Sequence, residues 1–219
     1  YKLKTDERFK NIYTVFAGGD DLFLIGAWNR IIEFAGFLNE SFREYVCQNE
    51  KITISAGIAL HKPNTPVLTL AETSEHALHT SKSSGRNSIT IFGETAKWDD
   101  FTKLQGIKNT IENWLDSEMI NNAMLFRLNE FIEMRRQEEE VTKGGVVYLE
   151  DMECLKWHSR FKYTVVRNIG KGLKGDDKQK AIDEAMKIAD WLQTYKGTLK
   201  IPLWQVIYNR RQGGQKYGD

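Results

Sequence analysis

Residues 12–25 read Ile-Tyr-Thr-Val-Phe-Ala-Gly-Gly-Asp-Asp-Leu-Phe-Leu-Ile. Two apolar runs, at 12–17 and 22–25, are separated by the tetrapeptide Gly18-Gly19-Asp20-Asp21. Glycine adopts the positive φ that tight hairpins need, so this stretch predicts a strand, a turn and a second strand. Taken alone, the pattern is a good hairpin turn that carries two acidic side chains.

The segment after the hairpin alternates helical and strand patterns. Residues 52–60 alternate large aliphatic with small or polar side chains, which predicts a strand with one buried face and one open face. The open face is expected to carry Ser55 and Gly57. The elements expected after the hairpin are a helix over 28–45, a strand over 52–60, a helix over 68–83 that ends before Gly85, and a strand over 89–92.

From residue 95 onward the apolar periodicity is almost wholly helical, so we place a domain boundary after residue 94. Residues 1–94 then form an α+β domain, and residues 95–219 form an all-α helical bundle. The helices expected in the second domain lie at about 98–117, 118–140 and 149–168, from a cap at Asp176 or Asp177 to Tyr195, and from Pro202 onward.

Composition restricts the functions that the chain can have. With 31 basic and 30 acidic residues, the net charge of +1 provides no global field that would favour nucleic acid or a membrane. Contact with RNA must then come from local groups, among which Arg210, Arg211 and Lys216 are candidates. The two cysteines, Cys47 and Cys154, lack the spacing of a zinc site or a disulfide framework. We expect a cytoplasmic protein with no membrane partner.

The acidic pair at the turn has a chemical interpretation. Polymerases and nucleotide cyclases hold two divalent cations on carboxylates, and these metals bind the triphosphate and stabilise the departing pyrophosphate. Mg²⁺ prefers carboxylates together with phosphate oxygens and keeps several waters, so few protein ligands are needed. Because alternation along a strand sends Asp20 and Asp21 to opposite faces, we expect one direct ligand and one helper.

Several separated segments resemble the nucleotidyl cyclase superfamily. Residues 18–21 stand where diguanylate cyclases have Gly-Gly-Asp-Glu-Phe, residues 52–59 resemble the strand that follows, and residues 77–87 resemble the superfamily's Ala-Leu-x-x-Ala-Lys-x-x-Gly-Arg-Asn segment. Aspartate at the fourth motif position is the pattern of the Cas10 family of type III CRISPR effectors. Residues 91–99 and 199–204 are similar to its type III-A form, Csm1.

The resemblance implies a metal-dependent nucleotidyltransferase on a ferredoxin-like palm, in which helices accompany an antiparallel sheet. It implies synthesis of cyclic oligoadenylate from ATP when the effector complex binds target RNA. The expected cofactors are two Mg²⁺ or Mn²⁺ ions. The expected partners are ATP, other Csm subunits, and, through the complex, crRNA and target RNA.

The resemblance also implies roles for individual residues. Asp21 is the expected direct metal ligand, and Asp20 is the second acid of the motif, so both are catalytic and metal-binding candidates. Asn87 stands beside Arg86 in the same segment, but it can equally serve to satisfy the local backbone. Ser55 can bind the nucleotide or serve only as a structural residue of its strand. The expected nucleotide-binding residues are Gly18, Gly19, Ser55, Lys82 and Arg86.

The chain departs from the family pattern in one respect. A family palm opens with a strand that bears another metal-binding aspartate and with a helix, whereas residues 1–11 hold only Asp6 in a polar segment. We therefore expect a partial palm that is inactive as this chain alone, and we expect no nuclease activity from it. Two alternatives remain, namely a diguanylate-cyclase-like enzyme and a catalytically silent scaffold subunit of an RNA-guided complex.

Overall fold

The computed structural model describes residues 6–143, 152–170 and 174–214 of the 219-residue chain. The chain forms two compact units, Tyr1–Lys103 and Leu104–Asp219, and the division falls inside helix α4 (Trp98–Asp116). The sequence placed the boundary earlier, after residue 94. The boundary in the structure lies further along the chain. Strand β5 (Glu94–Lys97) and the first turn of α4, with the buried residues Trp98 and Phe101, belong to the first unit.

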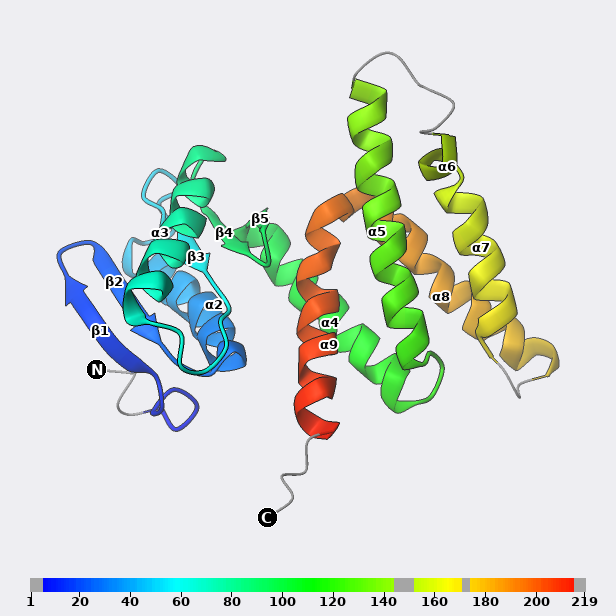
Figure 1. Ribbon diagram of the computed structural model, residues 1–219, viewed down its shortest axis with the longest axis horizontal. Coiled ribbons are helices and arrows are strands. Elements are labelled where there is room, and N and C mark those ends of the chain that lie inside the picture. The colour runs from blue at the N-terminus through cyan, green and yellow to red at the C-terminus, as the bar shows by residue number, and fades with distance from the viewer. Residues whose placement is uncertain (1–5, 144–151, 171–173, 215–219) are drawn as a thin grey trace. The chain divides into compact units, whose positions relative to one another are not determined.

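The first unit has the α+β composition expected from the sequence (Figure 1). Every predicted strand and helix of this unit is present, although the strand expected over 52–60 forms only at 56–58, and a further strand follows residue 93. Its elements before α4 are β1 (Tyr13–Gly18), β2 (Asp21–Ile25), α2 (Trp28–Tyr45), β3 (Ala56–Ile58), α3 (Val67–Ser83), β4 (Ser88–Ile91) and β5 (Glu94–Lys97).

The strands form two sheets. Strands β1 and β2 form an antiparallel hairpin, while β3, β4 and β5 form a separate sheet. Strand β4 pairs antiparallel with β5, as expected, and also parallel with β3, so the second sheet is mixed. The parallel pair follows from helix α3, because parallel neighbours need a crossover connection and a helix supplies it.

Strand β5 was missed because its turn has an unusual residue. Ile91 pairs with Glu94, which leaves Phe92 and Gly93 as a two-residue turn, with φ of 56° and 79°. Positive φ at both central residues is the pattern of a type I′ hairpin turn, in which asparagine or glycine usually stands at the first of them. The aromatic residue there instead indicated a continuing strand.

A small aromatic cluster holds α2 against the start of the chain. The rings of Phe9 and Phe34 lie 5.1 Å apart, edge to face, and Ile12 joins them in the core. Phe9 is fully buried, although residues 1–11 had been interpreted as a polar segment. Within α2, Ile32, Phe34 and Asn39 are buried, whereas Tyr45 at its end is 84% exposed.

The second unit is an all-α bundle, as expected. Helix α5 (Asn122–Lys143) packs against α7 (Trp157–Asn168), α8 (Gly175–Tyr195) and α9 (Lys200–Gly214) (Figure 1). A 3-10 helix, η2 (Lys196–Leu199), connects α8 to α9, and the short helix α6 (Met152–Leu155) precedes α7. The residues buried in this bundle include Leu128, Ile132, Phe161, Val165, Ala185, Ile188 and Leu192.

Two details of the bundle differ from the sequence prediction. The helix expected over 149–168 is divided into α6 and α7 with a break at Lys156, and its expected start at 149–151 lies outside the described residues. The N-cap of α8 is Lys174, so neither Asp176 nor Asp177 caps the helix. Both aspartates lie in the first turn, where their negative charges interact favourably with the positive end of the helix dipole. Across the described segments, no helix is both long enough and apolar enough to cross a bilayer.

Candidate functional site

The Gly-Gly-Asp-Asp motif forms the tip of the β1–β2 hairpin. Gly18 pairs with Asp21, so Gly19 and Asp20 are the two central residues of the turn. Gly19 has a φ of +60°, while Asp20 has no positive φ. Glycine at the first central position with positive φ there alone is the pattern of a type II′ turn. The predicted hairpin is therefore confirmed, and its geometry needs glycine at position 19.

The two motif carboxylates are available for a ligand. Asp20 and Asp21 are both exposed, and no hydrogen bond or ion pair engages either side chain within the described part of the chain. Adjacent carboxylates without a cation partner repel each other and attract a divalent cation. The tip therefore has the donor chemistry that Mg²⁺ or Mn²⁺ prefers, with Asp20 in the turn and Asp21 at the start of β2.

Asp6, the other acid considered near the start of the chain, is already engaged. Its carboxylate accepts hydrogen bonds from the backbone nitrogen of Arg8 at 3.0 Å and from Nη2 of Arg8 at 2.7 Å. The hydrogen bond with Asp6 raises the pKa of Arg8, which also donates to Glu33. Asp6 would have to leave this local turn to reach a metal. In the described ranges, no three histidine, cysteine, aspartate or glutamate side chains are grouped to hold a metal ion.

The side of β3 that was interpreted as open is covered at Gly57. A Cβ atom added to Gly57 would lie 2.1 Å from the backbone nitrogen of Leu78 and 2.6 Å from the carbonyl oxygen of Ser74, both in α3. Gly57 therefore permits close contact between strand and helix, and its assignment to an open face was wrong. Ser55 is half-buried and precedes β3. Its expected role in nucleotide binding stays a prediction.

Lys82 and Arg86 lie at the end of α3 and in the turn that follows it. Lys82 is in the last turn of the helix and is exposed. Gly85, Arg86 and Asn87 all have positive φ, of 92°, 54° and 50°. Three consecutive left-handed residues, two of them not glycine, are costly unless neighbouring groups hold them.

Lys97 of β5 supplies that support. Its Nζ donates to the carbonyl oxygens of Gly85 at 2.9 Å and Arg86 at 2.6 Å, and lies 3.3 Å from that of Ser84. The backbone nitrogen of Trp98 donates to the Asn87 carbonyl at 3.3 Å. The main chain of the Gly-Arg-Asn turn is thus fixed, while the Arg86 side chain is exposed with no partner within the part of the chain that the structure describes.

Two other supporting contacts were not predicted. Ser81 and Ser88 are fully buried, and their hydroxyls lie 2.8 Å apart, which ties the end of α3 to β4. The indole nitrogen of Trp98 donates to the carbonyl of Ile54 at 3.0 Å, beside Ser55. Sequence periodicity does not reveal such contacts, because each joins residues that no repeat or motif links.

The predicted site residues therefore fall into three groups. Gly18, Gly19, Asp20 and Asp21 share the hairpin tip, Lys82 and Arg86 share the end of α3, and Ser55 precedes β3. Among the described residues, no hydrogen bond or ion pair connects one group with another. Their common participation in one nucleotide site stays a prediction.

Comparison with known proteins identifies relatives of both units. Residues 2–90 match the model of the Cas10/Cmr2 family, second palm domain. A "CRISPR system single-strand-specific deoxyribonuclease Cas10/Csm1 (subtype III-A)" from Thermococcus onnurineus is 35% identical over 94 residues, which cover 43% of this chain and 12% of that protein. Its namesake from Streptococcus thermophilus is 30% identical over 165 residues, which cover 70% of this chain and 21% of that protein.

A solved structure shares the fold over most of the chain. A Csm1–Csm4 cassette in complex with one ATP has a TM-score of 0.57 and 25% identity, covering 88% of this chain and 26% of that chain. The chain spans only about 12% to 21% of the length of the curated relatives named above. Residues 2–90 nevertheless match the second palm domain of the Cas10/Cmr2 family, and the similar Cas10/Csm1 proteins support a Cas10/Csm1 palm fragment.

Proposed function

We propose that the chain contributes the nucleotide-converting palm of a type III-A CRISPR effector, which makes cyclic oligoadenylate from ATP when target RNA is bound. The observation that carries this proposal is the exposed acid pair Asp20 and Asp21, which has no partner in the described part of the chain, at the tip of a glycine hairpin. The sequence match to the Cas10/Cmr2 second palm supports it. The ATP in the similar Csm1–Csm4 structure supports the choice of nucleotide.

The proposed reaction is attack of a ribose 3′-hydroxyl on the α-phosphate of a second ATP. A phosphorus–oxygen bond to the hydroxyl oxygen forms, the bond to the departing pyrophosphate breaks, and the hydroxyl proton passes to solvent. Bound Mg²⁺ or Mn²⁺ would polarise the phosphate and stabilise the pyrophosphate. Asp21 and Asp20 would hold the metal, and Lys82 and Arg86, both exposed, would attract triphosphate oxygens.

The protein partners are proposed on the same basis. The similar solved structure is a cassette of Csm1 with Csm4, so we propose that this chain functions in contact with other Csm subunits. The effector complex would bring crRNA and target RNA. A partner subunit or a further Cas10 segment would also complete the metal coordination, because the described residues place only two free carboxylates at the tip.

The test compares two adjacent aspartate pairs in the assembled effector complex. Asp20→Asn with Asp21→Asn should lower oligoadenylate production from labelled ATP with target RNA by at least about a hundredfold, because metal stabilisation supplies several kcal/mol. The matched control is Asp176→Asn with Asp177→Asn, which changes the same charge in the exposed first turn of α8. The control complex should retain activity, and both complexes should assemble and bind RNA.

Two outcomes would favour the alternatives. Wild-type production by the hairpin variant would contradict the site and favour a scaffold subunit. Equal conversion of GTP into cyclic products would favour a diguanylate-cyclase-like enzyme.

A further inference from the structure

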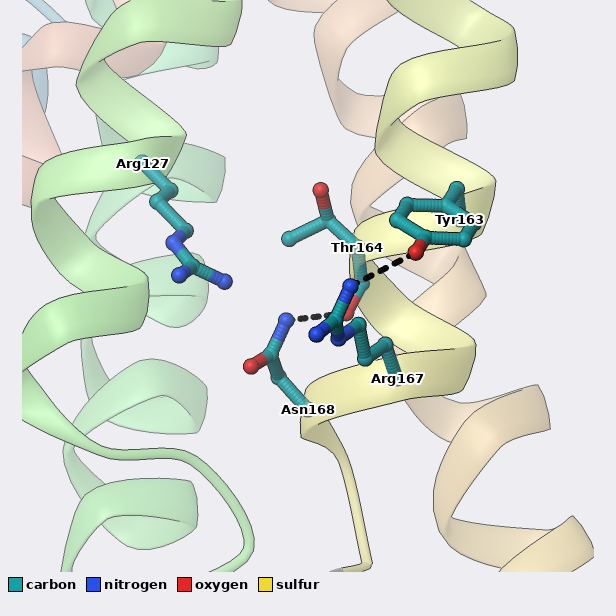
Figure 2. Close-up of a pocket in the computed structure, with 5 residues that line it drawn as sticks. All are labelled: Arg127, Tyr163, Thr164, Arg167 and Asn168. Carbon is teal, nitrogen blue, oxygen red and sulfur yellow. Dashed lines mark hydrogen bonds between the residues drawn. The ribbon is translucent and has the colours of Figure 1, made fainter.

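An open basic pocket lies in the second unit, between α5 and α7 (Figure 2). Its volume is about 550 Å³. Arg127 reaches it from α5, and the other lining residues are Tyr163, Thr164, Arg167 and Asn168 of α7. The pocket is formed within one unit and shares no residue with the hairpin site.

The lining groups are mostly hydrogen-bond donors. Nη1 of Arg167 donates to the Tyr163 hydroxyl at 2.7 Å, and Nδ2 of Asn168 donates to the carbonyl of Thr164 at 2.8 Å. These contacts use one donor of each side chain. Arg127 is exposed and, among the described residues, has no hydrogen-bond or ion-pair partner. Figure 2 shows its guanidinium extending toward the space in front of Arg167 and Asn168.

Neither Arg127 nor Arg167 forms an ion pair with a carboxylate among the described residues. No carboxylate belongs to the described lining. Helix α7 has the sequence Trp-His-Ser-Arg-Phe-Lys-Tyr-Thr-Val-Val-Arg-Asn, with three basic residues and no acidic one. Its Lys162 is exposed with no described partner, whereas Arg160 is held by Glu153. Charges left unpaired on one helix favour an anionic ligand.

An aromatic side chain stands beside the arginines. Tyr163 is 61% exposed, and the guanidinium of Arg167 lies 5.8 Å from its ring centroid. Exposed aromatic rings next to basic groups are the usual surface for single-stranded nucleic acid, because bases stack on the rings while the cations attract phosphates. A site for a small anion alone would not need an exposed ring.

We propose that this pocket binds a phosphodiester of single-stranded nucleic acid, with Arg127 and Arg167 on the phosphate and Tyr163 stacked on a neighbouring base. The other arginines suggested by the sequence fit this role less well. Arg210 is paired with Asp116, and Arg211 lies 5.9 Å from the ring of Tyr208. Lys216 lies outside the described residues. The proposal goes beyond nucleotide conversion at the hairpin and does not depend on it.

The experiment measures binding of the full 219-residue chain to fluorescent single-stranded RNA and to DNA of the same sequence by anisotropy. Arg127→Gln with Arg167→Gln should weaken binding about tenfold or more, since each removes a charge-assisted contact. It should also reduce the slope of log affinity against log salt by about 0.7 for each phosphate that is no longer neutralised. The same weakening with RNA and DNA indicates a phosphate contact, and a weakening confined to RNA indicates an additional 2′-hydroxyl contact.

The matched control is Arg136→Gln with Arg160→Gln. It removes one arginine from α5 and one from α7, so the net charge changes equally, but Glu140 and Glu153 already pair with these residues. Its effect should stay below about threefold, because exposed ion pairs contribute little and the pocket stays intact. A second pair separates stacking from hydrogen bonding. Tyr163→Ala should weaken binding about fivefold or more, whereas Tyr163→Phe should retain the ring's contribution.

Three results would overturn the proposal. Equal effects of the pocket and control variants would show that net charge alone decides binding. Arginine-dependent binding that ATP or inorganic phosphate abolishes at stoichiometric amounts would indicate a small-anion site. Absence of binding to both the RNA and the DNA at low salt would contradict the proposal and would favour an acidic protein partner for the pocket. If the double variant unfolds at a lower temperature, the single Arg127→Gln variant decides, because Arg127 makes no hydrogen bond or ion pair among the described residues.

Discussion

At the scale of single residues, Gly57 shows how a strand and a helix define this palm. The backbone of α3 lies so close to β3 that a Cβ atom at Gly57 would overlap Leu78 and Ser74. The overlap would be with backbone atoms of α3, so rotation of a side chain could not relieve it. The sequence signal was correct in predicting a strand here. The prediction that Gly57 lies on an open face was wrong. Alternation separates the two faces of a strand, but it does not indicate which face a helix covers.

The first prediction follows from that contact. Gly57→Ala should lower the free energy of unfolding by about 1–3 kcal/mol or more, as overpacking does. Gly106→Ala is the control, because Gly106 lies within helix α4, where an added Cβ atom would meet no atom within 4 Å beyond the nearby backbone of its own helix. It should raise the free energy of unfolding by up to about 1 kcal/mol, the difference in helix propensity. Urea unfolding of both variants measures this, and an unchanged midpoint for Gly57→Ala would contradict the close approach.

At the scale of elements, the turn after α3 depends on a strand that the sequence did not reveal. Lys97 of β5 reaches back to the carbonyls of Ser84, Gly85 and Arg86. Arg86, a candidate nucleotide-binding residue, therefore takes its backbone position from Lys97. Lys97 is a positioning residue for this turn.

The second prediction concerns this turn. Lys97→Met removes the ammonium while keeping the apolar stem, so the left-handed backbone at 85–87 loses its support. Amide hydrogen exchange in residues 84–88 should accelerate by about tenfold, corresponding to a local destabilisation of about 1 kcal/mol. Lys51→Met is the control, since the Lys51 ammonium has no partner in the described residues. Unchanged exchange at 84–88 in Lys97→Met would show that the turn is stable by itself.

Helix α5 contains a pH-sensitive contact with η2. Lys196 of η2 donates to the carboxylate of Glu139 at 2.8 Å, and this hydrogen bond is the main reason why the pKa of Glu139 lies below its ordinary value of 4.5. Lys143 contributes through a second contact at 3.1 Å. A carboxylate with a lowered pKa stabilises the folded state fully above its unfolded pKa. That contribution is lost as the pH falls through the folded pKa.

The third prediction is a difference in acid sensitivity. Glu139→Gln should lower the melting temperature at pH 7, and the difference from wild type should disappear as the pH falls below 4.5 and through the lowered pKa. Glu140→Gln is the control on the same helix, because its carboxylate is 69% exposed and 3.6 Å from Arg136. Its effect should be small at every pH. A difference for Glu139→Gln that persists at low pH would indicate impaired packing instead of a missing charge.

The elements also show what a single sequence can predict. The long helices α2, α4, α5, α8 and α9 were predicted because their apolar residues repeat over several turns. The hairpin at 18–21 was predicted because glycine marks the turn. Strand β5 was missed because Phe92 in its turn indicated a continuing strand, and the parallel pairing of β3 with β4 depends on a crossover that only the fold determines.

At the scale of the whole molecule, the described residues supply the two motif carboxylates of the candidate site but no third acid beside them. Asp20 and Asp21 were recognisable because a motif carries them, and the structure leaves both exposed. Lys97 was not recognisable, since it acts only through the carbonyls it contacts. No third acid joins the hairpin in the described chain, and Asp6 is held by Arg8. The described fold therefore places two carboxylates at the tip that we propose to bind metal, which are too few to hold both ions of a two-metal site.

The fourth prediction is that the 219-residue chain by itself binds a metal–nucleotide weakly and forms no cyclic product. Two-metal catalysis requires protein ligands that place both ions, whereas the described residues offer only two free carboxylates at the tip. Exposed Tyr13, Phe16 and Leu22 on the same hairpin also leave apolar surface for a covering segment or subunit. Parallel assays with labelled ATP, Mn²⁺ and target RNA should give product from the effector complex that contains this sequence and none from the chain alone.

Adding Mn²⁺ to the chain alone should broaden the NMR signals of residues 18–21, and Asp20→Asn with Asp21→Asn should remove that effect. Turnover by the chain alone at a rate near that of the complex would contradict this view. In that case Asp6 would be the acid to test, after its release from Arg8.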